Sequence, residues 1–163
     1  MTKLAFDNVT GPVFTLTDEL IQQGIRGSKE SDRRRIILPI HRVQNAEVQR
    51  MINFLQPGTY IRPHKHPLNH ATESLVLIQG AILFFTFSDI GEVETRRKVD
   101  SKPLSGVLDI EPNVWHSFIV LEPDTILFEC KRGPYDAETD KIFAPWAPEE
   151  GSDEADGWHD GKV

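Results

Sequence analysis

The chain has 163 residues, 39% of them hydrophobic, and a formal net charge of −7. These values are typical of one globular domain with a substantial core, and we expect a single domain over residues 1–163. The negative charge argues against nucleic acid as a partner, because binding phosphates needs a positive surface. The amino terminus has no basic start followed by an apolar stretch, and runs such as A-I-L-F-F are too short to span a bilayer. We therefore expect a cytoplasmic protein without a membrane partner.

The amino-terminal region predicts one short helix, from an N-cap at Thr17 to about Gln23, with Gly24 as its stop. Beyond it the pattern is almost entirely strand, and turn residues such as Pro57-Gly58 and Pro103 to Gly106 separate the segments. The predicted strands are 36–40, 47–55, 60–66, 73–79, 81–88, 92–99, 107–110, 116–121 and 125–130. Nine short strands favour an all-β fold, either a closed barrel or two antiparallel sheets.

Three segments of the sequence are rich in charged residues, one acidic and two basic. Residues 149–163 hold six acids and one lysine, which predicts an acidic C-terminal tail. The basic clusters Arg33–Arg35 and Arg96–Lys98 are expected to be solvated strand ends or turns rather than anion sites.

The most informative pair is His64 and His66, because residues at i and i+2 of an extended segment project from the same face. Glu73 and His116 follow on two further strand segments. Three imidazoles and one carboxylate are sufficient to hold one divalent transition metal with coordination positions left open. Fe, Mn, Ni, Co and Zn all suit this donor set, and affinity order alone does not choose among them.

The spacing around these residues resembles the two cupin motifs. Gly58-x5-His64-x-His66 with Glu73-x6-Gly80 is similar to the first motif, and Gly106-x5-Pro112 with His116 is similar to the second. Two departures stand out. The gap from His66 to Glu73 is longer than usual, and Asn113 stands where the second motif has a turn glycine, since Asn tolerates a left-handed conformation.

Over about residues 14–148 the chain also resembles the WbuC family of cupin-fold metalloproteins. The segments that carry this resemblance are 31–36, 48–53, 62–67, 111–116 and 128–148. The resemblance implies a cupin double-stranded β-helix, a jelly-roll barrel with its core at 41–133, with a short N-terminal helix and extended terminal segments. It also implies a bound metal and an association with bacterial polysaccharide (O-antigen) gene clusters.

Several side chains keep alternative readings. His70 lies four residues after His66 and is the rival to Glu73 as a ligand. Arg62 and Tyr60 share the strand face of the two histidines if parity holds, which makes them candidate substrate-binding residues. Alternatively Arg62 pairs with an acid at the barrel rim, and Pro63 twists the strand.

The remaining candidates have structural readings. His41 is expected to be a structural or rim histidine, His159 to lie in the tail, and Cys130 to fill space. Tyr135, Phe143 and Trp146 are expected to cover a barrel end or a subunit face. Together with an amino-terminal arm of about 30 residues, more than a barrel needs, this segment predicts a homodimer.

Two classes of function remain open at this point. One is a metal-dependent enzyme of the isomerase, epimerase or dioxygenase type that acts on a small polar ligand, a sugar or an organic acid. The other is a non-enzymatic accessory protein that binds such a ligand without converting it. No general base is evident besides the metal ligands, so the catalytic residues are unknown.

Overall fold

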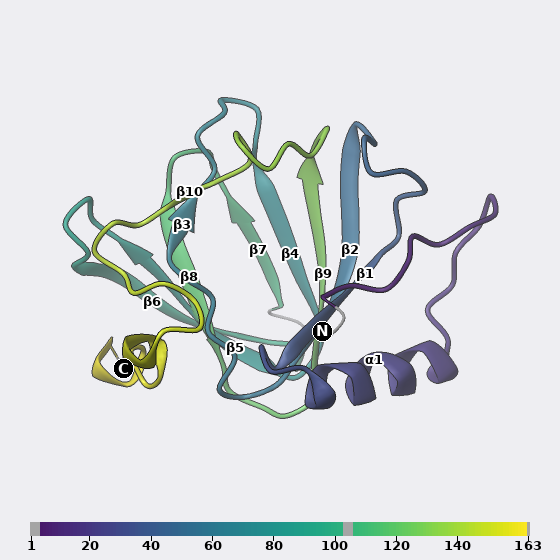
Figure 1. Ribbon diagram of the computed structural model, residues 1–163, viewed down its shortest axis with the longest axis horizontal. Coiled ribbons are helices and arrows are strands. Elements are labelled where there is room, and N and C mark those ends of the chain that lie inside the picture. Colours follow the sequence, from purple (N-terminus) through teal and green to yellow (C-terminus); the bar gives the residue numbers. More distant parts are fainter. Residues whose placement is uncertain (1–3, 103–105, 163) are drawn as a thin grey trace.

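In a computed structural model, residues 4–102 and 106–162 form two facing antiparallel sheets of five strands each, with one α-helix across one end (Figure 1). The first sheet has the strand order β1-β2-β9-β4-β7 and the second has the order β10-β3-β8-β5-β6. The predicted all-β fold with an amino-terminal helix is therefore confirmed. Within the described residues, no helix is both long and apolar enough to cross a bilayer.

The elements have the following bounds: α1 Asp18–Glu30, β1 Arg35–Pro39, β2 Val48–Leu55, β3 His64–Lys65, β4 Glu73–Gln79, β5 Ala81–Phe87, β6 Val93–Asp100, β7 Val107–Ile110, β8 Trp115–Val120, β9 Thr125–Arg132 and β10 Ile142–Phe143. Two short 3-10 helices, Asp153–Ala155 and Asp160–Lys162, follow near the carboxy terminus. The turn expected at 103–106 falls largely on residues 103–105, which lie outside the described residues.

The helix α1 begins as predicted and ends later. Thr17 caps it, because its hydroxyl accepts a hydrogen bond from the backbone N–H of Leu20 at 3.3 Å. Gly24 does not stop the helix, which continues to Glu30. A Cβ at Gly24 would lie 2.4 Å from ring atoms of Phe54, so this glycine permits close approach of helix and sheet instead.

The predicted strand 60–66 is wrong in length, since β3 spans only two residues. The carbonyls just before it bond elsewhere: Tyr60 O accepts from Arg35 Nη1 at 3.0 Å, and Ile61 O from the Ser117 hydroxyl. Pro63 also lacks the N–H that a ladder needs. The strand β10, which pairs with β3, has no equivalent among the predicted strands.

Successive side chains along a strand point to opposite faces of the sheet, and on the first sheet both faces are apolar: one faces the other sheet, and one faces outward. On β1, Ile36 and Leu38 pack outward with Phe54 against α1 and the amino-terminal arm. Their neighbours Arg35 and Ile37 face an interior cavity. A separate interior cluster fills the rest of the space between the sheets; it includes Leu55, Leu75, Leu77, Ile82, Phe84, Phe118 and Leu127.

The carboxy-terminal segment packs on the outer face of the second sheet. Trp146 and Trp158 stack with ring centroids 6.1 Å apart, and the same cluster includes Phe87 of β5. Ala155 and His159 are buried. The acidic region expected as a tail is thus packed against the barrel (Figure 1), because its apolar residues Ala155 and Trp158 pack inward.

Candidate metal centre

Four of the predicted ligands lie together between the sheets. His64 is the first residue of β3, His116 pairs with it from β8, and Glu73 is the first residue of β4. His66 follows β3. The ligand atoms of all four lie within 4.8 Å of one another, and all four residues are buried. The cluster could hold a metal ion.

Each imidazole is held by its Nδ1 atom. His64 Nδ1 bonds to the Arg62 carbonyl at 2.9 Å, and His116 Nδ1 to the Val114 carbonyl at 2.8 Å. His66 Nδ1 bonds to the carbonyl of Asp140 at 2.6 Å. A carbonyl only accepts, so the proton is on Nδ1 and the Nε2 lone pair of each neutral ring is free to bind a cation.

The Nε2 atoms provide the test of fit. Those of His66 and His116 are buried and have no hydrogen-bond partner among residues 4–102 and 106–162. They lie 3.4 and 3.2 Å from the same oxygen of Glu73. Lone pairs of neutral imidazoles that face a carboxylate oxygen repel one another, and a cation among them removes that repulsion. The residues present therefore fit a divalent transition metal.

The ionisation states agree with this chemistry. Burial, together with the nearby His116, holds the pKa of His64 well below its usual value, so its ring is neutral. Burial alone would raise the pKa of Glu73. Hydrogen bonds and positive charge from the side chains of His116 and His66 outweigh that effect and hold the pKa of Glu73 well below the usual range; a cation among neutral rings would favour the ionised carboxylate in the same way. Neutral imidazoles and an ionised carboxylate are the forms that bind metal.

Both departures from the cupin spacing have a structural explanation. The longer gap forms a turn in which His70 is exposed, while Glu73 enters the cluster. Asn113 has a φ of 67°, as predicted, and its backbone N–H donates to the carbonyl of His66 at 2.9 Å. The turn that has Asn113 in place of glycine thus contacts the segment that carries His66 directly.

The cluster opens into a cavity of about 410 Å³. Arg62 lines it, donating to the Ala144 carbonyl at 3.3 Å, and its Nη1 lies 3.9 Å from the Glu149 carboxylate. In the part of the chain that the structure describes, its buried Nε has no hydrogen-bond partner. Tyr60 is not among the residues that line the cavity: its hydroxyl donates to the Pro148 carbonyl and its ring contacts Trp158. The substrate role of Tyr60 stays a prediction.

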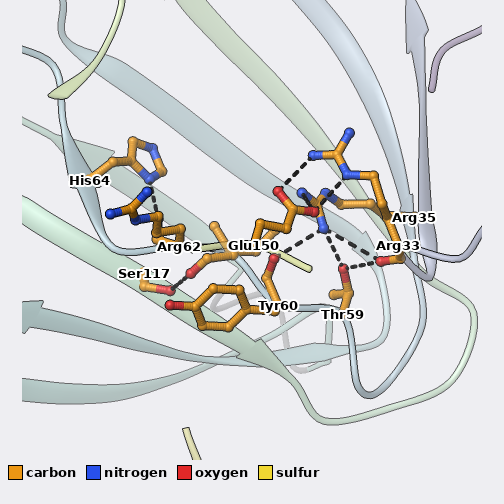
Figure 2. A network of polar contacts seen from close by, with 9 residues as sticks. Arg33, Arg35, Thr59, Tyr60, Arg62, His64, Ser117 and Glu150 are labelled. Carbon is orange, nitrogen blue, oxygen red and sulfur yellow. Dashed lines mark hydrogen bonds and ion pairs between the residues drawn. The ribbon is translucent and has the colours of Figure 1, made fainter. Parts of the chain in front are cut away.

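The basic cluster at 33–35 is not simply solvated, contrary to expectation. Arg33 donates to both carboxylate oxygens of Glu150, at 2.6 and 3.1 Å, and Arg35 donates to one of them at 2.6 Å (Figure 2). Arg35 is buried, and burial, reinforced by the charge of Arg33, lowers its pKa to about 10. The cluster was expected to be solvated because its counter-charge, Glu150, lies far away along the sequence.

Several charged residues that line the cavity, among them Glu129 and Asp140, were not predicted as site residues. Glu129 accepts a hydrogen bond from Asn53 at 3.1 Å, and burial and the nearby Glu73 raise its pKa to about 8. Lys131 pairs with Asp140, and both are buried. On β9, Glu129 and Lys131 alternate with the outward Phe128, a parity that could have revealed them.

Comparison with known proteins places the sequence in a family. The model of a domain of unknown function, DUF6016, matches residues 16–99. The chain belongs to the DUF6016 family. The matched region includes His64, His66 and Glu73, and ends before His116. A search of curated proteins gave no match.

The fold of this DUF6016 protein is that of cupins, as solved structures show. An oxalate oxidase in complex with the substrate analogue glycolate matches with a TM-score of 0.54 and 15% identity over 71% of this chain and 58% of its own. A further oxalate oxidase structure gives 0.54 and 16%, over 76% and 61%. Oxalate decarboxylase from Bacillus subtilis gives 0.50 and 14%, over 67% and 27%. At such identities the likeness shows the fold alone.

Proposed function

We propose that this protein is a metal-dependent cupin that binds one divalent transition metal through His64, His66, Glu73 and His116. The observation that carries the proposal is the pair of buried, partnerless Nε2 atoms beside the Glu73 carboxylate. When bound, the metal would polarise an oxygen of the ligand as a Lewis acid. Fe, Mn, Ni, Co and Zn all suit the donor set.

The ligand in this proposal is a small polar molecule, a sugar or an organic acid. The cavity of about 410 Å³ is within the range of small-molecule sites. Arg62 lines it, and its guanidinium suits an anionic group on the ligand, whereas Lys131 and Lys141 lie beside the carboxylate of Asp140. Arg62 is the best candidate to bind that group, because its Nε–H is buried and unpaired.

We further propose a WbuC-type role linked to bacterial polysaccharide or O-antigen biosynthesis, with an isomerase, epimerase or dioxygenase type of reaction. What supports the WbuC assignment is the set of sequence segments between residues 31 and 148 described above, together with the cupin fold. The alternative is an accessory protein that only binds its ligand. It is favoured by the ion pairs Lys131–Asp140 and Arg35–Glu150, which hold these charged side chains of the cavity in fixed contacts with each other.

The cellular setting and oligomeric state belong to the same proposal: a cytoplasmic homodimer. The two long terminal segments do not support the dimer, because both cover the protein's own sheets. Apolar side chains remain exposed on β4 and β7, namely Val76, Ile78 and Val107. Light scattering at tens of micromolar is expected to give twice the monomer mass, and a monomer would reject the dimer.

The central experiment is elemental analysis of protein purified without an affinity tag. About one transition metal per chain is expected, and protein stripped by a chelator should recover one ion with micromolar or better affinity. A chain that takes up none of the five metals contradicts the proposal. Nucleotide sugars, sugar acids and small organic acids are then screened for thermal shift and turnover; binding without turnover supports the accessory role.

A further inference from the structure

The segment 134–150, which we call the C-terminal strap, forms one wall of the cavity. Tyr135, Asp140, Lys141, Phe143 and Glu150 of the strap all line it. The strap runs from the end of β9 across to the second sheet, where β10 pairs with β3 (Figure 1).

The strap reaches the metal-ligand cluster in a way that singles out one histidine. His64 and His116 are held by carbonyls two residues earlier in their own segments. His66 has no such local acceptor: its Nδ1 donates to the Asp140 carbonyl, 74 residues further along the chain. The orientation of His66 therefore depends on the position of the strap.

A buried ion pair fixes the strap at that point. The Asp140 carboxylate bonds to the ammonium of Lys131 on β9, and the two side chains are only 8% and 6% exposed. Lys141 is more distant, at 3.8 Å. The backbone N–H of Asp140 also donates to Asp136 O at 2.8 Å. Removing one partner of a buried pair leaves an uncompensated charge, so this contact strongly favours one strap position.

The C-terminal strap also pairs with β3, the strand that carries the ligand His64. Phe143 lies opposite His64 in the β10–β3 register, and the Ala144 N–H donates to the Pro63 carbonyl at 2.9 Å. Residues 140–144 thus contact both ends of the His64-x-His66 motif.

We propose that the Lys131–Asp140 pair positions His66 for metal binding, so that docking of the strap and binding of the metal are coupled. This inference rests on the proposed metal site. Lys131 and Asp140 are positioning residues, since they act through the imidazole of His66. Coupling between two binding events is reciprocal, so the metal also stabilises the docked strap, and with it one wall of the ligand cavity.

The test compares metal affinity, by chelator competition, among purified variants. Asp140→Asn keeps the side-chain volume but weakens the pair with Lys131, and Lys131→Met removes its charge. Outer-shell changes of this kind lower metal affinity by about 10- to 100-fold, and we expect at least a 10-fold loss in both variants. Lys131→Arg keeps the cation and should stay within about 3-fold of the original protein on the same scale.

The matched control is Glu149→Gln, which removes a carboxylate from the same strap. Glu149 is 84% exposed, and its carboxylate lies 3.9 Å from Arg62 Nη1; the substitution leaves the Arg62 carbonyl that holds His64 in place, so metal affinity should be unchanged. The visible spectrum of the cobalt-loaded protein gives a second readout, since a displaced imidazole alters the bands whereas a general loss of stability does not. Unchanged affinity and spectrum in Asp140→Asn would overturn the inference.

Hydrogen exchange of the unaltered chain tests the reciprocal effect. Amides of residues 135–144 should exchange more slowly with metal than without it, and more so than amides of α1, which is distant from the strap. Equal protection with and without metal would overturn the coupling. If the unaltered protein binds no metal at all, the proposed function fails instead, so the two failures are distinguishable.

Discussion

At the scale of single residues, the centre depends on one carboxylate among three imidazoles. Glu73 is the first residue of β4, and Gly80 follows the last residue of that strand. A Cβ at Gly80 would lie 2.2 Å from the Thr125 hydroxyl oxygen, so this position requires a glycine. The longer loop before Glu73 lengthens the connection without moving the ligand, because extra loop residues cost little free energy.

The first prediction separates Glu73 from its rival His70. Substituting Glu73→Gln should reduce the metal content of the purified protein to a small fraction of one ion per chain, because the only anionic ligand is lost. His70→Ala should leave the content unchanged, since His70 is exposed outside the cluster. Elemental analysis of both variants checks this. An empty site in His70→Ala beside a full one in Glu73→Gln would reverse the assignment.

The second prediction concerns Arg62. Truncation to Ala should weaken an anionic ligand by roughly 1.5–3 kcal/mol, the usual contribution of a hydrogen bond to a charged group. Metal content should not change, because His64 is held by the backbone carbonyl of Arg62, which the substitution retains. Calorimetric titration with the ligand found by screening measures the effect. Unchanged affinity with a lower melting temperature would instead indicate a structural role beside Phe143, whose ring lies 5.2 Å from the guanidinium.

The sequence indicated the four clustered residues because a metal site needs particular side-chain types at particular spacings. The same reasoning could not reveal Asp140 as the acceptor of His66. It acts through its carbonyl, which every residue possesses, so no residue type signals the contact. The partner of Arg33 and Arg35 was hidden for a different reason: Glu150 is more than 110 residues away along the chain.

At the scale of elements, regular strands were predicted better than the irregular segments beside them. The bounds of β4 and β7 agree with prediction, because apolar residues continue between clear turn signals. Segment 60–66 has the same residue pattern, yet only two residues form a strand. Its carbonyls bond to side chains from other parts of the fold, which a local pattern cannot show.

The third prediction tests why α1 runs through Gly24. An alanine there would gain about 1 kcal/mol in helix propensity but would press its Cβ against the Phe54 ring, and overpacking typically costs 1–3 kcal/mol. We expect the free energy of unfolding to fall on balance by up to about 2 kcal/mol, as measured by urea denaturation. The control is Gly27→Ala, where the nearest side-chain atom is 3.2 Å away and the loss should be smaller. An equal loss in both would contradict the packing argument.

At the scale of the whole molecule, the barrel has an added layer on each side. The amino-terminal arm and α1 cover one sheet, and the carboxy-terminal aromatic residues cover the other. The acidic composition of 149–163 suggested a solvated tail because composition averages over the segment. A few apolar side chains, chiefly Trp158 and Ala155, are enough to hold it on the barrel.

The fourth prediction concerns the acid sensitivity of this arrangement. Burial alone would raise the pKa of Glu150, but hydrogen bonds from Arg33 and the charge of Arg35 outweigh it and hold the pKa below its usual value. A carboxyl whose folded-state pKa is lowered stabilises the fold above its unfolded pKa of about 4.3, and that contribution is lost as the pH falls through the folded-state pKa.

Melting temperatures between pH 3 and pH 7 test this expectation. The protein should melt above its Glu150→Gln variant at pH 7, and the difference should shrink as the pH falls below about 4. Glu149→Gln, which changes a largely exposed neighbour, should show little difference at any pH. A gap between protein and Glu150→Gln that is constant with pH would exclude an ionic origin.

The bond from His66 to Asp140 also has a consequence for the order of events during synthesis. A ribosome makes His64, His66, Glu73 and His116 before it makes residue 140, so all four side chains exist for some time without the acceptor that orients His66. The β10–β3 pairing is equally late. A nascent chain can begin to fold domain by domain, but this centre can be completed only after residue 140 has been made. Acquisition of the ion is therefore expected to follow synthesis rather than guide it.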